Sequence, residues 1–144
     1  LKISEFSGLL PRTIDYLFSK ISSQPEYKTC TFSMKCSFLE IYNENLYDLL
    51  GNISPDVPTL TVSGFYGNNQ RPLYIRDQGD SVKVENLSEH IIKSTESALE
   101  LINVGLKNRA TAPTAVNKES SRSHAVFSIY IENKTTIKNK KSVN

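Results

Sequence analysis

Hydrophobic residues recur along the chain with two different spacings, and each spacing predicts a different element. Between Gly8 and Ser22 the apolar positions follow the period of a helix, and Pro11 suits the first turn of that helix. Between Thr31 and Tyr42 apolar and polar residues alternate, which is typical of a strand. Because Leu39 and Ile41 add apolar side chains to its second face, we expect this strand to lie inside a sheet.

After this strand the apolar alternation gives way to polar breaks. The run Asn43 to Asn45 interrupts the pattern, and the residues from Leu46 to Leu50 predict a short amphipathic turn that packs back on the sheet. Residues 51–72 are rich in glycine, proline, asparagine and serine, so they predict a surface loop or hairpin excursion.

Short extended runs, a helix and a long strand make up the second half. The runs Leu73–Arg76, Val82–Val84 and Glu89–Ile92, with a turn at residues 78–80, predict a small antiparallel lobe. Ser94 or Thr95 suits the cap of a helix that ends at Asn108 and Arg109. Residues 125–132 then alternate as a final strand. Helices and strands in this order predict an α/β fold in which helices flank a sheet.

Composition narrows the class of protein. With 144 residues, of which 38% are hydrophobic, the chain is long enough for one domain or for part of a larger one. A net charge of +2 is too small to favour nucleic acid, and no apolar run is long enough to span a membrane. Cys30 and Cys36 share one predicted strand at a separation of roughly 20 Å, so they cannot bridge each other. Because the sequence also shows no signal peptide and no Cys-rich framework, a reducing interior compartment is expected.

The run from Asn117 to His124 carries the most distinctive chemistry of the chain. It places three serines, an amide and an arginine within eight positions, between the predicted helix and the final strand. Serine hydroxyls can join the oxygen ligands of Mg²⁺, and the guanidinium of Arg122 can form a bidentate ion pair with a carboxylate. The run therefore indicates a nucleotide switch, although no Gly-x-x-x-x-Gly-Lys-Ser/Thr run accompanies it.

Two long motifs carry a resemblance to a known family. The segment Cys36–Leu50 resembles a strand and following turn of kinesin motor domains, and Asn117–His124 matches their first switch, N-x-x-S-S-R-S-H. Gly8–Arg12 resembles the helix that follows the family's phosphate loop, and Gly105–Arg109 resembles the helix end that leads into the switch. The resemblance covers most of residues 8–134. Within the family, the chain most resembles mitotic, plus-end-directed kinesins.

The resemblance implies the middle portion of an ATP-driven microtubule motor. Residues 1–144 would form part of a P-loop NTPase-like mixed β-sheet flanked by helices, with a small antiparallel lobe. The phosphate loop would precede Leu1 and the second switch would follow Asn144, so the isolated segment is expected to be inactive. ATP and Mg²⁺ are the implied cofactors, and microtubules are the implied partner. The parent protein would be oligomeric through a coiled coil outside the segment and would lie in the cytoplasm on microtubules, including those of the mitotic spindle.

The resemblance also assigns roles to the switch residues. Ser120 and Ser121 match serines that approach the terminal phosphate and Mg²⁺, with Ser121 as the expected metal ligand. Arg122 matches an arginine that pairs with a glutamate of the second switch, and Asn117 offers an amide to the nucleotide. Ser120, Ser121 and Arg122 are thus the expected catalytic residues, while Ser123 and His124 are expected to anchor the switch to the strand.

The sequence also allows functions other than that of a motor. A catalytically inactive, kinesin-like microtubule-binding module is the main alternative, and a basic footprint on tubulin could use Arg71, Arg76, Lys83 and Lys93. A serine hydrolase is disfavoured because Ser123 and His124 are neighbours on a strand and point to opposite faces. The carboxylates of Glu40, Glu44 and Asp48 are expected to be solvated or structural, without a catalytic role.

Overall fold

The computed structural model describes residues 8–23, 30–51, 71–110 and 123–135. The elements in chain order are α1 (Leu9–Ser23), β1 (Cys30–Tyr42), β2 (Asn45–Asp48), β3 (Tyr74–Asp77), β4 (Val82–Glu85), β5 (His90–Ile91), α2 (Thr95–Ala110) and β6 (Ser123–Thr135). The predicted α/β class with a small antiparallel lobe is confirmed, and every strand pair in the described residues is antiparallel. Neither described helix is long and apolar enough to cross a membrane.

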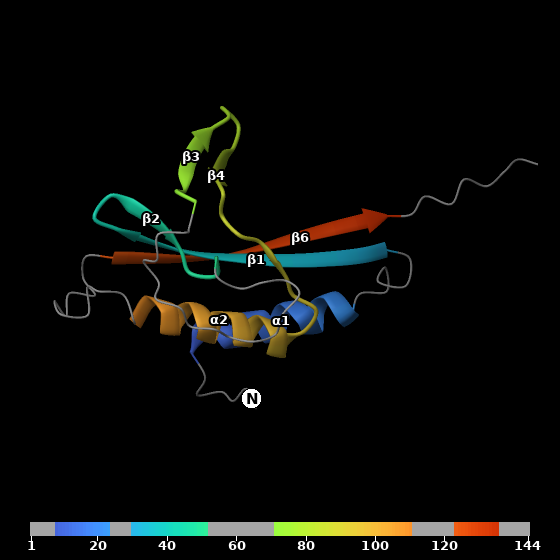
Figure 1. Ribbon diagram of the computed structural model, residues 1–144. Helices are drawn as coiled ribbons and strands as arrows, with labels where there is room; N and C mark the ends of the chain where they lie inside the picture. Colours follow the sequence, from blue (N-terminus) through green and yellow to red (C-terminus); the bar gives the residue numbers. More distant parts are fainter. Residues whose placement is uncertain (1–7, 24–29, 52–70, 111–122, 136–144) are drawn as a thin grey trace, which may run out of the picture.

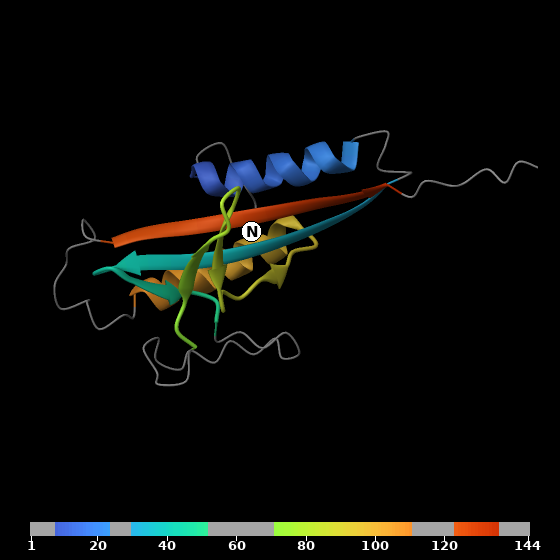
Figure 2. The ribbon, with the colours of Figure 1, turned by 90° about the horizontal axis from the view of Figure 1, so that it is seen from above.

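Strand β1 organises the main sheet. It pairs with β6 along its whole length, from Cys30 opposite Thr135 to Tyr42 opposite Ser123. Strands β5 and β2 share its other edge, β5 at Lys35 and Cys36 and β2 at residues 39–42. Figure 2 shows β1 and β6 running side by side as the longest elements of the molecule. An interior position for β1 was expected from its two apolar faces, and the pairing confirms it.

Both helices cover the same face of this sheet, as Figure 1 shows. Side chains from β1, β2, β6 and the two helices meet there in one apolar core, which includes Ile14, Cys36, Phe38, Leu49 and Ile102. Ile14, Leu49 and Cys36 are fully buried. Burial raises the pKa of the Cys36 thiol to about 11, so this cysteine is an apolar core residue and not a reactive nucleophile.

Helix α2 approaches β1 closely at one glycine. A Cβ atom added at Gly105 would lie within 2.6 Å of Cε1 of Phe38 and closer still to Cδ1 of the same ring. The Phe38 ring is itself held edge-on against Phe127 of β6, with centroids 5.4 Å apart. Because the ring is packed from two sides, the helix can sit at this distance only without a side chain at position 105.

Two expected features are wrong in detail. Residues 46–48 were expected to form a turn, but they belong to β2, which forms a tight hairpin with β1. The hairpin closes through Asn43 and Glu44, whose φ angles of 48° and 62° are those of a primed two-residue turn. Residues 89–92 were expected in the small lobe, but β5 pairs with β1 in the main sheet. In both cases the backbone N–H and C=O groups of the short segment form hydrogen bonds with the long strand β1, and the local sequence pattern does not reveal this pairing.

The small lobe is a single hairpin. Strands β3 and β4 pair from Tyr74 opposite Glu85 to Asp77 opposite Val82, and Gly79 with a φ of 83° lies in the turn. Figure 1 shows this hairpin standing away from the sheet on the side opposite the two helices. Its side chains are largely exposed, and they include the apolar Tyr74, Ile75 and Val82. The excursion expected at residues 51–72 lies outside the described residues, except for its ends.

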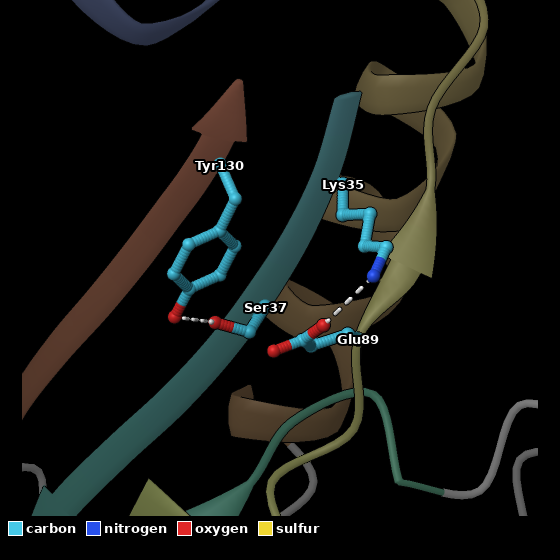
Figure 3. Close-up of polar contacts among 4 residues, drawn as sticks. All are labelled: Lys35, Ser37, Glu89 and Tyr130. Atoms are coloured by element: carbon cyan, nitrogen blue, oxygen red, sulfur yellow. Dashed lines mark hydrogen bonds and ion pairs between the residues drawn. The ribbon is translucent and has the colours of Figure 1, made fainter. Parts of the chain in front are cut away.

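Polar contacts join neighbouring segments on the sheet face opposite the helices. Figure 3 shows the hydroxyls of Ser37 and Tyr130 in contact at 3.3 Å, and Nζ of Lys35 at 3.4 Å from Oε2 of Glu89. The first contact joins β1 to β6, and the second joins β1 to the segment before β5. Because Lys35 and Glu89 are partly exposed, their ion pair contributes little to stability, on the order of 0–1 kcal/mol.

Helix α2 begins with a serine cap. The backbone N–H of Ser97 donates to Oγ of Ser94 at 3.2 Å, and the hydroxyl of Ser97 in turn accepts from the backbone N–H of Ser94 at 3.1 Å. This reciprocal pair resembles a capping box with serine in the third helical position. Of the two cap residues that the sequence allowed, Ser94 is therefore the one used.

Candidate functional site

The expected switch lies partly outside the described residues. Asn117, Ser120, Ser121 and Arg122 all fall in the segment 111–122, whose structure is not described, and their roles remain predictions. Ser123 and His124 are described and are the first two residues of β6. The site can therefore be built only from its downstream end, where the switch motif joins the sheet.

Ser123 lies at the meeting point of three elements. Its hydroxyl accepts a hydrogen bond from Nη2 of Arg109 at 2.9 Å. The same guanidinium donates through Nε to Oε1 of Glu40 at 3.1 Å. Arg109 belongs to the last turn of α2 and Glu40 to the end of β1, so the three side chains join the helix and both long strands. We call Glu40, Arg109 and Ser123 the switch-base cluster.

The two charged side chains of the switch-base cluster, Glu40 and Arg109, pair with each other. The Glu40 side chain is 6% exposed, and a buried carboxylate is costly unless an opposite charge or hydrogen-bond donors compensate it. The planar guanidinium of Arg109 supplies that charge and still has a donor left for Ser123. A cation in the last turn of α2 also interacts favourably with the carbonyl groups at the helix C-terminus.

The neighbouring residues hold the end of α2 firmly in place. The side-chain amide of Asn108 is buried and donates to the backbone oxygen of Leu49 at 2.8 Å. Together with the close approach of Gly105 to Phe38, this bond ties the last turn of α2 to β1 and to the end of β2. The guanidinium of Arg109 therefore projects from a rigid support.

His124 does not take part in this cluster. It pairs with Ile41 in the ladder, while Ser123 pairs with Tyr42, and successive residues of a strand point to opposite faces. His124 is exposed. The geometry disfavours a nucleophile and base formed by Ser123 and His124, because the Ser123 hydroxyl faces Arg109.

A second polar group surrounds the end of β2. The buried carboxylate of Asp48 accepts hydrogen bonds from the backbone N–H groups of Leu50 at 2.9 Å and Ser88 at 2.7 Å. Nε2 of His90 lies 3.2 Å from the hydroxyl of Ser88. Burial lowers the pKa of His90, with the nearby charge of Asp48 acting in the opposite direction. Because these two hydrogen bonds of the carboxylate come from backbone N–H groups, this group connects β2 to β5 and does not form a catalytic triad.

The basic residues expected to touch tubulin are exposed but do not form one patch. Arg76 and Lys83 are directly opposite each other on the hairpin. Arg76 is partly neutralised, because its Nε lies 3.0 Å from Oε2 of Glu85. Lys93 precedes α2, which Figure 1 places on the other side of the sheet from the hairpin, and Arg71 precedes β3. No group of metal-binding side chains occurs within the described residues.

Two residues of the switch-base cluster were missed from the sequence. The sequence predicts Arg109 only as the end of a helix, and Glu40 only as a solvated or structural carboxylate. A signal for Glu40 was present, since it continues the alternation of Met34, Cys36 and Phe38 on the face that packs against the helices. No comparable pattern identifies Arg109.

Comparison with known proteins agrees with the motifs. The family model described as the kinesin motor domain matches residues 2–144. The chain is 40% identical over 133 residues to the kinesin-like protein KIN-12C of Arabidopsis thaliana, a match that covers 90% of this chain and 6% of that protein. It is 39% identical over 128 residues to the human kinesin-like protein KIF15, covering 87% of this chain and 8% of that protein.

The mouse kinesin-like protein KIF9 is 36% identical over 125 residues, a match that covers 87% of this chain and 14% of that protein. The chain thus spans only a small part of the length of these relatives. Because the family model matches nearly every residue, and the relatives align over most of the chain, the chain belongs to the kinesin motor domain family.

Proposed function

We propose that the protein carrying this chain hydrolyses ATP in the presence of Mg²⁺ and uses the reaction to move along microtubules. The observation that carries this proposal is the match of the kinesin motor domain over residues 2–144. The switch motif at Asn117–His124 supports it, because its hydroxyl, amide and guanidinium groups are the types that recognise phosphate and hard cations.

The proposed roles of the switch residues are those that the resemblance to kinesin motor domains implies, and they suit the chemistry of phosphoryl transfer. A water oxygen attacks the γ-phosphorus, the bond to the bridging oxygen of ADP breaks, and inorganic phosphate and ADP result. Mg²⁺ neutralises charge on the phosphate oxygens when it is bound. Ser120 and Ser121 hold the terminal phosphate and the metal, Asn117 orients the nucleotide, and Arg122 fixes the active arrangement through a carboxylate of the second switch. Catalysis of this kind depends on position and charge.

Phosphate release by the complete protein tests this function. We expect the complete protein to release phosphate from ATP and to do so faster when microtubules are added. The isolated residues 1–144 are expected to show no release, since they contain no Gly-x-x-x-x-Gly-Lys-Ser/Thr run to hold the phosphates. Sedimentation of the complete protein with microtubules without any ATP hydrolysis would favour the inactive binding module. Release by the isolated segment would contradict the expected inactivity.

We propose further that exposed lysines beside the sheet contribute to microtubule binding. Lys83 on the hairpin and Lys93 before α2 are exposed, and no ion pair of either occurs among the described residues. Arg71 and Arg76 are weaker candidates, Arg76 because of its pairing with Glu85. Charges at an interface rim mainly affect the association rate and its salt dependence.

Reversing one of these charges is expected to weaken binding several-fold. Lys83→Glu and Lys93→Glu should each raise the microtubule concentration required for half-maximal sedimentation by roughly 3- to 10-fold at low salt, with a smaller effect at high salt. Lys20→Glu is the control, because Lys20 is also an exposed lysine, lies on α1 and is not a proposed contact residue; its Nζ lies 5.4 Å from the centroid of the Tyr16 ring. Equal affinities for all three variants would exclude Lys83 and Lys93 from the interface.

We also propose that the parent protein lies in the cytoplasm on microtubules, including the mitotic spindle, and that it is oligomeric through a coiled coil outside this segment. Membership of the kinesin motor domain family supports the association with microtubules. Light scattering of the complete protein measures the oligomeric state.

A further inference from the structure

We propose that Arg109 is a positioning residue that sets the start of β6, and with it the end of the switch motif, and that Glu40 orients Arg109 for this role. The proposal rests on the proposed ATPase function and extends it to two residues outside the switch motif. Arg109 acts through Ser123 and touches neither nucleotide nor metal in this proposal.

Ser123 lies at the end of the ladder between β1 and β6. The pair of Tyr42 and Ser123 is the last of the long pairing between β1 and β6. The end of a ladder opens more readily than its middle, because it has neighbours on one side only. It is at this end pair that Arg109 adds a side-chain bond from a third element.

Ser123 is connected both to the rest of the switch motif, through the chain, and to α2, through Arg109. Ser123 follows Arg122 in the chain without an intervening residue, so the position of Ser123 sets where the switch motif enters β6. Arg109 and Ser123 are 14 residues apart in sequence, and their bond brings the end of α2 and the start of β6 together. One guanidinium thus joins the end of the helix that precedes the switch motif to the seventh residue of that motif.

The Glu40 carboxylate is buried, which costs free energy. Glu40 lies on the helix-covered face of β1, where an apolar residue would continue the pattern of Phe38 without burying a charge. The thirteen residue pairs between β1 and β6 are joined through their backbones, so the pairing does not need the Glu40 carboxylate. What the carboxylate does provide is a fixed orientation of Arg109, since Nε is held by Glu40 while Nη2 points to Ser123.

The test uses the complete motor and measures nucleotide binding apart from hydrolysis. Arg109→Ala and Ser123→Ala should each slow single-turnover ATP hydrolysis about tenfold, while the affinity for ADP stays unchanged. The double variant should be no slower than the slower single variant, because both changes remove the same contact. Ser123→Thr keeps the hydroxyl and should retain most of the rate, while Glu40→Gln should show a smaller loss than Arg109→Ala.

Lys35→Ala is the matched control, because it removes an ion pair that also begins on β1 but lies on the open face of the sheet. Its rate should equal that of the unchanged motor. Additive losses for Arg109 and Ser123, or no loss in either, would overturn the positioning role while leaving the ATPase intact. If the complete motor without any substitution shows no ATPase activity, both the proposed function and this inference are overturned. Thermal unfolding of each variant shows which losses reflect misfolding; Ser123→Ala is the mild variant for this purpose, because it removes one partly buried hydroxyl.

Discussion

Replacement of Arg122 by alanine in the complete motor is expected to reduce microtubule-stimulated ATP hydrolysis by at least about a hundredfold, with little change in nucleotide affinity. Arg122 occupies the arginine position of the N-x-x-S-S-R-S-H motif. The proposed ion pair with a second-switch carboxylate forms only in the closed arrangement, so its loss affects the reaction more than the binding step. Phosphate release with saturating microtubules and titration with a fluorescent nucleotide measure the two quantities.

Arg122→Lys is the matched variant for this experiment. Lysine keeps the charge but loses the planar fork that binds a carboxylate through two bonds, so only part of the activity should return. Full activity in Arg122→Lys would show that charge alone suffices. Unchanged turnover in Arg122→Ala would refute the role of this arginine as a latch.

The substitution Gly105→Ala is expected to destabilise the motor domain by about 2 kcal/mol. Overpacking against Phe38 lowers the stability, and the higher helix propensity of alanine offsets a smaller part of this loss. The added Cβ would lie within 2.6 Å of the ring, and that ring cannot retreat easily because Phe127 packs against it at 5.4 Å between centroids. Gly105→Val should cost more, since it adds two further methyl groups at the same place. Urea unfolding followed by circular dichroism measures the change.

Gly8→Ala provides the control for Gly105→Ala. No heavy atom beyond its chain neighbours lies within 4 Å of a Cβ built at Gly8, so the same substitution should cost only the lower preference of alanine for the N-cap position, up to about 1 kcal/mol. A second check combines Gly105→Ala with Phe38→Leu: the smaller, flexible side chain should recover part of the loss. Equal stability of Gly105→Ala and the unchanged domain would mean that the ring moves aside without cost.

Elements with a sustained period were predictable from the sequence. The helix that opens near Pro11, the strand that ends at Tyr42 and the helix capped at Ser94 all lie where their apolar spacing placed them. The hairpin at Asn43 and Glu44 was missed because neither residue is glycine, although both adopt positive φ angles. A local pattern also could not decide that β5 pairs with β1, because that choice depends on contacts between residues far apart in the chain.

The sequence predicted the switch motif of the candidate site, but it did not predict the two residues, Glu40 and Arg109, that hold the end of this motif. The hydroxyls and the guanidinium of residues 117–124 stand out because they are contiguous. Glu40 and Arg109 are separated by 69 positions, and their contact exists only once α2 lies across β1. Each is an ordinary residue for its own element, so only the fold reveals that they act together.

Strand β6 has a consequence for handling the segment on its own. Within the described residues it pairs with β1 alone, so its second edge presents a row of backbone donors and acceptors along 13 residues. Val126, Tyr130 and Ile131 are exposed on the same strand. A long, uncovered edge with apolar side chains is a template for strands of other molecules. Self-association and precipitation are thus the expected hazards when residues 1–144 are purified alone.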